Sequence, residues 1–235
     1  MRHILTAVVL SLTLGLSAWA TPMRLQLING SSVVNIFDGG VNDNNAVVGA
    51  VTYAGSIGNW DVTVTTALGS NVLSPIGHMD LTSININSFG VGNPGSLIIQ
   101  FTELNINIPY NSFVMQVGGT TSRTTMSYST YYDNTNSYST TSTGAVQAGA
   151  TPVLIGTLGP YSAASFSGSM TGYTSPSSNY SLTQVLTISA ISPFPGNSFG
   201  ADAELIPNPV PEPTTLLLLG SGLLTAAAAF RKIKG

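Results

Sequence analysis

The chain contains no cysteine, and this absence excludes disulfides as a means of stabilising an exported fold. Zinc centres need several Cys or His ligands. The sequence has only two histidines, His3 and His78, and therefore cannot supply such a site. Without these supports, a domain of this chain must depend on a large hydrophobic core, for which 235 residues are sufficient.

Charged residues are also scarce, at 6% of the sequence against about 25% in an ordinary soluble domain. Only six residues are Lys or Arg. Four of these lie near the ends of the sequence: Arg2, Arg231, Lys232 and Lys234. Binding to duplex nucleic acid needs a patch of cations that displaces counterions. We therefore expect no nucleic-acid partner.

Residues that could carry catalysis are also scarce, because most of them are charged residues or histidines. Nucleophilic hydrolysis needs a Ser or Thr oriented by a base, yet His78 is the only histidine after the first twenty residues, and we interpret it as a loop or strand-edge residue. Glycoside hydrolysis needs two facing carboxylates, and the sequence singles out no pair. The candidate carboxylates are Asp38, Asp43, Asp61, Asp80, Glu103, Asp133, Asp202 and Glu204. We predict a protein that is not an enzyme.

The first twenty residues, MRHILTAVVLSLTLGLSAWA, have the three parts of a secretion signal. Arg2 supplies the positive region, an apolar run follows, and Ala18 and Ala20 form the small-x-small pattern of a signal peptidase site. We predict that residues 1–20 are a signal peptide cleaved after Ala20. An uncleaved membrane helix is the alternative, although the apolar run is short for spanning a bilayer.

The last residues combine alternating prolines, an apolar stretch and a basic cluster. We predict an extended Pro-rich spacer at 207–213 and a transmembrane helix with a basic tail at 214–235. The apolar stretch gives roughly 26 Å of helix, slightly less than the hydrocarbon core. Positive-inside logic leaves Arg231, Lys232 and Lys234 in the cytoplasm and the preceding domain across the inner membrane.

This tail resembles the PEP-CTERM family through Pro211-Glu212-Pro213, the apolar helix and the basic cluster that follows it. The resemblance implies a sorting signal that is processed by a membrane-embedded exosortase. It also implies transient residence in the inner membrane of a Gram-negative bacterium that makes exopolysaccharide, followed by transfer to the cell surface. A permanent tail anchor and a eukaryotic GPI signal remain as alternatives; the latter normally ends in its hydrophobic stretch.

Between the two ends, at residues 21–206, short apolar-alternating runs are separated by turn residues. Period two predicts strands, and we expect ten or eleven of them in an all-β antiparallel sandwich or jelly-roll-like domain. A β-solenoid is the alternative, but no fixed repeat occurs. The alternation predicts five sets of residues that each share one face of a strand: Trp60, Val62, Val64, Thr66 and Leu68; Ile84 and Ile86; Leu97, Ile99 and Phe101; Phe113, Met115 and Val117; and Leu182, Leu186 and Ile188.

The segment 120–144 is low in complexity and allows two interpretations. It could be a disordered, glycosylated stalk. Alternation of Met126, Tyr128, Thr130 and Tyr132 with small polar residues favours a half-exposed strand followed by a loop. Stretches such as AVTYAGSIGNWDVTV and YSLTQVLTISA make the whole domain similar to a recurrent type of exported PEP-CTERM protein. That resemblance implies the fold and the export, but it implies no catalytic or binding activity.

The best candidate for a ligand site is the loop DGGVNDNN. Asp38, Asn42, Asp43 and Asn44 offer hard oxygen atoms beside glycines, which suits Ca²⁺. A plain Asx-rich turn is the alternative, because Asp and Asn tolerate left-handed backbone. No other cofactor is expected.

Four functions remain open on the sequence alone. The leading hypothesis is a non-catalytic structural or interaction protein of the bacterial envelope and its polysaccharide matrix. The second is a carbohydrate-binding module in which Trp60, Tyr53, Tyr131 or Tyr132 stacks on sugars; several aromatic residues on one exposed face would support it. A matrix polysaccharide hydrolase would require a cleft with two close carboxylates. An ice-binding surface would require regularly spaced Thr residues.

Overall fold

The structure is a computed structural model that describes residues 22–90, 92–138 and 150–208. These residues form twelve strands in chain order: β1 (Met23–Asn29), β2 (Ser32–Phe37), β3 (Ala50–Ile57), β4 (Trp60–Leu68), β5 (Met79–Ser88), β6 (Ser96–Ile106), β7 (Ser112–Ser122), β8 (Thr124–Asp133), β9 (Val153–Tyr161), β10 (Ser165–Tyr173), β11 (Tyr180–Ala190) and β12 (Ser198–Pro207). Helices do not occur within the described ranges.

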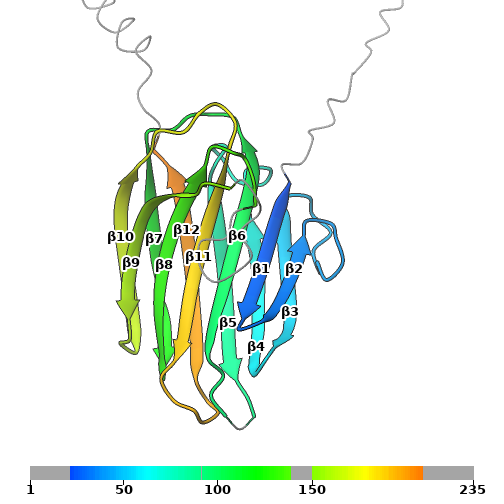
Figure 1. Cartoon of the computed structure of the whole chain (residues 1–235), viewed down its shortest axis with the longest axis vertical. Helices are drawn as coiled ribbons and strands as arrows, with labels where there is room; N and C mark the ends of the chain where they lie inside the picture. Colours follow the sequence, from blue (N-terminus) through cyan, green and yellow to red (C-terminus); the bar gives the residue numbers. More distant parts are fainter. Residues whose placement is uncertain (1–21, 91, 139–149, 209–235) are drawn as a thin grey trace, which may run out of the picture.

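The strands pair into two six-stranded sheets that pack face to face (Figure 1). Sheet A has the order β2-β1-β6-β11-β8-β9, and sheet B has the order β10-β7-β12-β5-β4-β3. Every paired neighbour is antiparallel. The prediction of an all-β fold of antiparallel sheets is confirmed, and the solenoid alternative is excluded for this part of the chain.

The expected number of strands was too low, since the structure has twelve. The strand β10 shows why pattern reading undercounts. Its sequence, SFSGSMTGY, places Ser and Gly at most positions and therefore gives little apolar alternation. Its pairing with β7 decides its structure, and that pairing is a long-range property.

Apolar alternation correctly identified most residues of the inner faces. Side chains that were predicted to share a face on β5, β6, β7 and β11 are all buried in one core cluster between the sheets. In the segment 120–144, the predicted strand is β8, whose Met126, Tyr128, Thr130 and Tyr132 all lie on the buried face. The strand interpretation is thus confirmed for residues 124–133.

One predicted face was wrong, and a bulge in β4 explains the error. Trp60 and Val64 are buried as expected, but further along β4 it is Ala67 that is buried, while Thr66 and Leu68 are only half-buried. The register between β3 and β4 shifts between Val51 and Tyr53, so that an extra residue of β4 is accommodated. A bulge reverses the phase of a period-two pattern. The prediction assumed an unbroken alternation and therefore assigned Thr66 and Leu68 to the wrong face.

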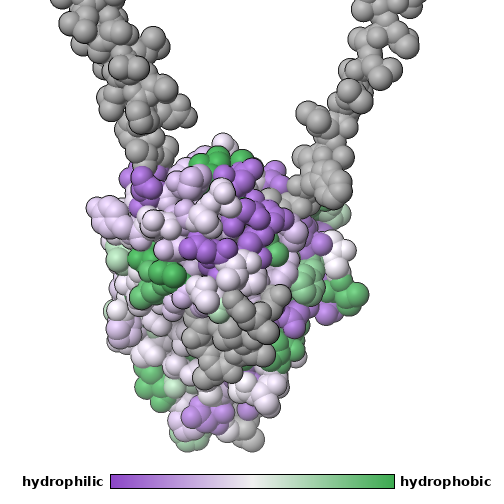
Figure 2. Space-filling model, turned by 45° about the horizontal axis from the view of Figure 1, so that its top comes forward, coloured by the Kyte–Doolittle hydropathy of each residue, from purple (hydrophilic) through white to green (hydrophobic). Residues whose placement is uncertain are grey.

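The described chain enters and leaves the sandwich at the same end. The start of β1 and the end of β12 both lie at the top of the view in Figure 1. In Figure 2, hydrophilic residues gather around this end, and the hydrophobic residues form separate patches among them. The opposite end carries the turns before β6 and β12.

Candidate functional site: a carboxylate-lined hollow on sheet B

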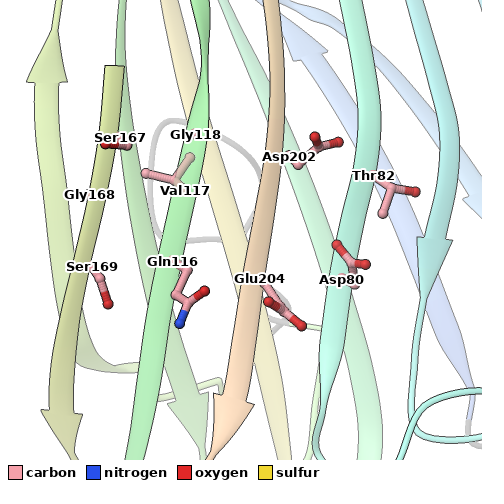
Figure 3. A pocket seen from close by; sticks show the side chains of 10 residues that line it. All are labelled: Asp80, Thr82, Gln116, Val117, Gly118, Ser167, Gly168, Ser169, Asp202 and Glu204. Carbon is pink, nitrogen blue, oxygen red and sulfur yellow. The ribbon is translucent and has the colours of Figure 1, made fainter. Parts of the chain in front are cut away.

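The outer face of sheet B carries an open hollow that crosses four adjacent strands (Figure 3). It has a volume of about 500 Å³. Its lining comes from β10, β7, β12 and β5: Asp80, Thr82, Gln116, Val117, Gly118, Ser167, Gly168, Ser169, Asp202 and Glu204. The carboxylates and Thr82 lie on the side of β12 and β5, and Gln116, Ser167 and Ser169 lie on the side of β7 and β10.

Strand periodicity places these polar side chains on the outer face. Glu204 lies on β12 between the buried residues Ala203 and Leu205, so it must point away from the core. Asp202 lies opposite a bulge, because the register between β12 and β5 shifts between Ala201 and Ala203. There the backbone N–H of Ser83 donates a hydrogen bond to Asp202 Oδ1. This bond fixes the Asp202 carboxylate at the edge of the hollow.

The register brings two carboxylates together. Glu204 is paired directly with Asp80 on the neighbouring strand, and directly opposed side chains are within interaction distance. His78 also reaches this pair, since its Nε2 lies 2.6 Å from Glu204 Oε1. Its other ring nitrogen, Nδ1, lies 3.2 Å from the carbonyl oxygen of Ser74. A histidine that precedes β5 thus completes the site.

The environment of Asp80 raises its pKa to about 6. Burial is the largest cause, and the negative charges of Glu204 and Asp202 add to it, while His78 acts in the opposite direction. Beneath the hollow, the hydroxyl of Tyr128 donates to the backbone carbonyl of Glu204 at 3.1 Å and to Gln184 Oε1 at 3.0 Å. Burial raises the pKa of Tyr128 well above its usual value, and this hydroxyl connects the two sheets through the core.

The raised pKa of Asp80 predicts a pH-dependent stability. The folded protein binds this proton more tightly than the unfolded chain does, so the free energy of unfolding should fall as the pH rises from about 4 through about 6. The full effect would be about 3 kcal/mol, but solvent in the open hollow screens it. We therefore expect Asp80→Asn to stabilise the domain at pH 7 by about 1–2 kcal/mol.

Urea unfolding of both proteins at pH 4 and pH 7 measures this difference, which should nearly vanish at pH 4. Asp61→Asn, an exposed carboxylate on β4, is the matched control and should change the stability by less than about 0.5 kcal/mol. A destabilised Asp80→Asn variant at pH 7 would contradict the prediction.

The aromatic residues proposed for sugar stacking do not form a common exposed surface. Trp60, Tyr53 and Tyr132 are buried in the core between the sheets, and Trp60 Nε1 donates to the carbonyl of Pro94 at 3.1 Å. Tyr131 lies on the outer face of sheet A, packed against a small apolar cluster. The structure therefore does not bring together the four residues that the sequence suggested.

The loop suggested for calcium uses its carboxylates to bind backbone amides. Asp43 Oδ1 accepts from the N–H groups of Asn45 and Thr52, each at 3.0 Å, and Asp43 Oδ2 accepts from Gly39 at 2.9 Å. Asp38 accepts from the N–H of Gly49 at 2.9 Å. Asn42 has the left-handed backbone that the alternative of an Asx-rich turn requires, and Asn44 also lies in this loop. Calcium binding by Asp38, Asn42, Asp43 and Asn44 stays a prediction.

No group of three or more His, Asp or Glu side chains within the described ranges is arranged to hold a metal ion.

Several predicted sites lie outside the described residues. These are the signal cleavage positions Ala18 and Ala20, the motif Pro211-Glu212-Pro213, and the basic cluster Arg231, Lys232 and Lys234. Within the residues that are described, no helix has the length and hydropathy needed to cross a bilayer. The predicted terminal helices are likewise outside this part of the chain.

Sequence reasoning missed the hollow itself. Alternation in the stretch ADAELIP would have placed Asp202 and Glu204 on the outer face of a strand. Nothing in the sequence, however, showed that Glu204 lies beside Asp80 or against His78, which is 126 positions away. Those contacts depend on β5 and β12 being neighbours.

Comparison with known proteins identifies the end of the chain. The family model for the PEP-CTERM protein-sorting motif matches residues 209–232, which include Pro211-Glu212-Pro213 and the first two residues of the basic cluster. No curated protein matches the chain significantly. The motif implies export, membrane-associated sorting and processing by an exosortase. The chain is thus an exported protein that carries a PEP-CTERM sorting signal directly after a two-sheet β domain.

Proposed function

We propose that this protein is a non-catalytic interaction module of the bacterial surface, and that it binds polysaccharide of the extracellular matrix in the hollow of sheet B. The observation that supports this proposal is the hollow itself. Carboxylates, hydroxyls and an amide from four strands line it, and its lining contains no Lys or Arg. Such groups donate and accept hydrogen bonds in the way that sugar hydroxyl groups require. Its open shape suits a polymer that passes across the sheet.

The chemistry of the lining narrows the class of ligand. Asp80, Asp202 and Glu204 repel acidic polysaccharides, so a neutral glycan is the favoured partner. Gln116 and Ser169 are exposed on the opposite side of the hollow, where each can bond to a sugar hydroxyl. On the same face of β10, Tyr173 is 80% exposed, and it provides a single aromatic ring at the end of this strand.

Binding of the domain comprising residues 22–208 to neutral β-glucans and α-glucans tests the proposal. The double variant Gln116→Ala, Ser169→Ala removes two hydrogen-bonding groups without touching the core, so affinity should fall about tenfold. The matched control is Thr63→Ala, Asn87→Ala, which alters exposed positions on β4 and β5 outside the hollow. Equal affinity of the two variants, measured by calorimetry, would contradict the proposed surface.

A matrix polysaccharide hydrolase is the second candidate, and one observation favours it. Asp80 and Glu204 are a directly opposed pair of carboxyl groups, and the pKa of Asp80 is raised to about 6. A carboxyl group with a raised pKa beside a second carboxyl group is the kind of arrangement that glycoside hydrolysis uses. New reducing ends in the same glucan incubations, abolished in Asp80→Asn, would favour this function over simple binding.

A further inference from the structure

Each sheet of the sandwich has two edge strands: β2 and β9 in sheet A, and β3 and β10 in sheet B. An edge strand presents backbone N–H and C=O groups on its open side, and another strand can pair with them. Proteins usually prevent such pairing by covering the edge, shortening it, interrupting it or charging it. The four edges of this domain differ in this respect.

The edge of β3 is covered by the loop that follows β2. The N–H of Asn44 donates to the carbonyl of Thr52 at 2.8 Å, and the N–H of Thr52 donates to Asp43 Oδ1 at 3.0 Å. The carboxylate of Asp43 therefore occupies the position in which an added strand would place a carbonyl oxygen to accept from the N–H of Thr52. This gives the loop proposed for calcium a structural role at the edge of sheet B.

The two edges of sheet A are shortened or interrupted. The strand β2 has only six residues. The strand β9 shifts register twice against β8, once between Met126 and Tyr128 and once between Thr130 and Tyr131, and it contains Pro160. Bulges and proline both hinder the addition of a further strand.

The strand β10 has none of these protections. It pairs with β7 in one continuous register over nine residues, from Ser165 to Tyr173, and it contains no proline and no charged residue. Ser165, Ser167, Ser169, Thr171 and Tyr173 are exposed along its outer face. The inner face of β10 packs against β9, where Tyr161 stacks on Phe166. Its outer face is part of a regular and neutral edge of sheet B.

We propose that β10 is a self-association edge, along which a second copy of this chain adds its own β10 in the antiparallel direction. The two B sheets then form one continuous sheet across a twofold axis. Antiparallel pairing is the arrangement that a twofold interface permits, because each strand makes the same contacts with the other. The proposal does not depend on whether the hollow binds a glycan.

The sequence of β10 is complementary to its own reverse. When all nine residues overlap, Ser169 lies opposite its own copy, Phe166 lies opposite Gly172, and Gly168 lies opposite Met170. Each large apolar side chain of the inner face therefore lies opposite a glycine, next to the Ile155 or Tyr161 side chain of the other copy that packs over that glycine. The outer face pairs hydroxyl groups at its centre. Because the strand carries no charge, no like charges meet across the axis.

This pairing also determines how two domains are oriented. The start of β1 and the end of β12 lie at the same end of each sandwich (Figure 1), so an antiparallel pair points these ends in opposite directions. Such a pair connects domains that extend from two facing surfaces, or domains that have left the membrane. A soluble preparation of residues 22–208, which contains both sheets and the whole described core, is therefore the right form for a test.

Cysteine cross-linking tests the register directly, because the chain has no cysteine of its own. Opposed residues in an antiparallel pair have Cα atoms about 4.5–5.5 Å apart, which is within the range that a disulfide bridges. We expect Ser169→Cys to form a covalent dimer under mild oxidation at least about tenfold more than Asn87→Cys, an exposed control on β5. An equal mixture of Ser167→Cys and Thr171→Cys should also cross-link.

A second measurement uses uncross-linked protein. Ser169→Lys places two like charges opposite each other on the twofold axis, so it should weaken dimerisation about tenfold or more in sedimentation equilibrium, whereas Asn87→Lys should not. The proposal is overturned if the unaltered domain is monomeric up to about 100 µM, or if the β10 cysteines cross-link no more than the control does.

Discussion

Replacement of Pro211, Glu212 and Pro213 by alanines is expected to trap the full-length protein in the inner membrane. The family match places the sorting motif at residues 209–232, and an exosortase must read this motif before it can process the tail. The expected effect is close to complete, because the reaction depends on recognition of a short peptide. Fractionation followed by mass spectrometry measures the distribution between the inner membrane and the cell surface.

Two further variants make this experiment specific. Pro209→Ala alters a neighbouring proline outside the three-residue motif and should leave sorting unchanged. Replacement of Arg231, Lys232 and Lys234 should remove the stop-transfer signal and give soluble periplasmic protein. A surface form of the unaltered protein that still carries residues 214–235 would show that the tail is a permanent anchor, and the sorting interpretation would then fail.

Truncation of Trp60 is expected to have the largest effect on stability. Trp60 is fully buried in the core, and its Nε1–H donates to the carbonyl of Pro94. Trp60→Ala should therefore lower the free energy of unfolding by about 3–5 kcal/mol, through lost burial and the cavity left behind. For a domain of this size the thermal midpoint should fall by roughly 10 °C.

Thermal and urea unfolding measure the change, with Tyr173→Ala as the matched aromatic control. Because Tyr173 is 80% exposed, its loss should cost less than about 0.5 kcal/mol. A third variant, Trp60→Phe, tests function. Glycan affinity that is lost in Trp60→Phe while stability is retained would return Trp60 to the set of sugar-stacking residues, against its position in the core.

The properties that follow from local patterns were predictable from the sequence. Period two in apolar residues predicts strands with an apolar inner face, and the predicted inner-face residues of β5, β6, β7, β8 and β11 are buried between the sheets. The sorting motif was recognisable for a related reason, since three contiguous elements within residues 209–232 specify it. Scarcity of charge also indicated the neutral character of the surface.

Interruptions of the pattern were not predictable in the same way. The bulge in β4 reverses the faces of Thr66, Ala67 and Leu68, because one extra residue changes the phase of the alternation. The strand β10 gave a weak signal, since a strand of Ser and Gly is stabilised by its neighbour β7 and not by its own apolar residues.

The sequence by itself determined that this protein carries a sorting signal and which residues of most strands line its core, because both depend on residues that are close together in the chain. Only the tertiary structure decided the hollow and the open edge. Asp80 meets Glu204 because β5 and β12 are neighbours in sheet B, and His78 meets Glu204 across 126 positions. Strand order is set by the packing of the whole core, and no local pattern encodes it.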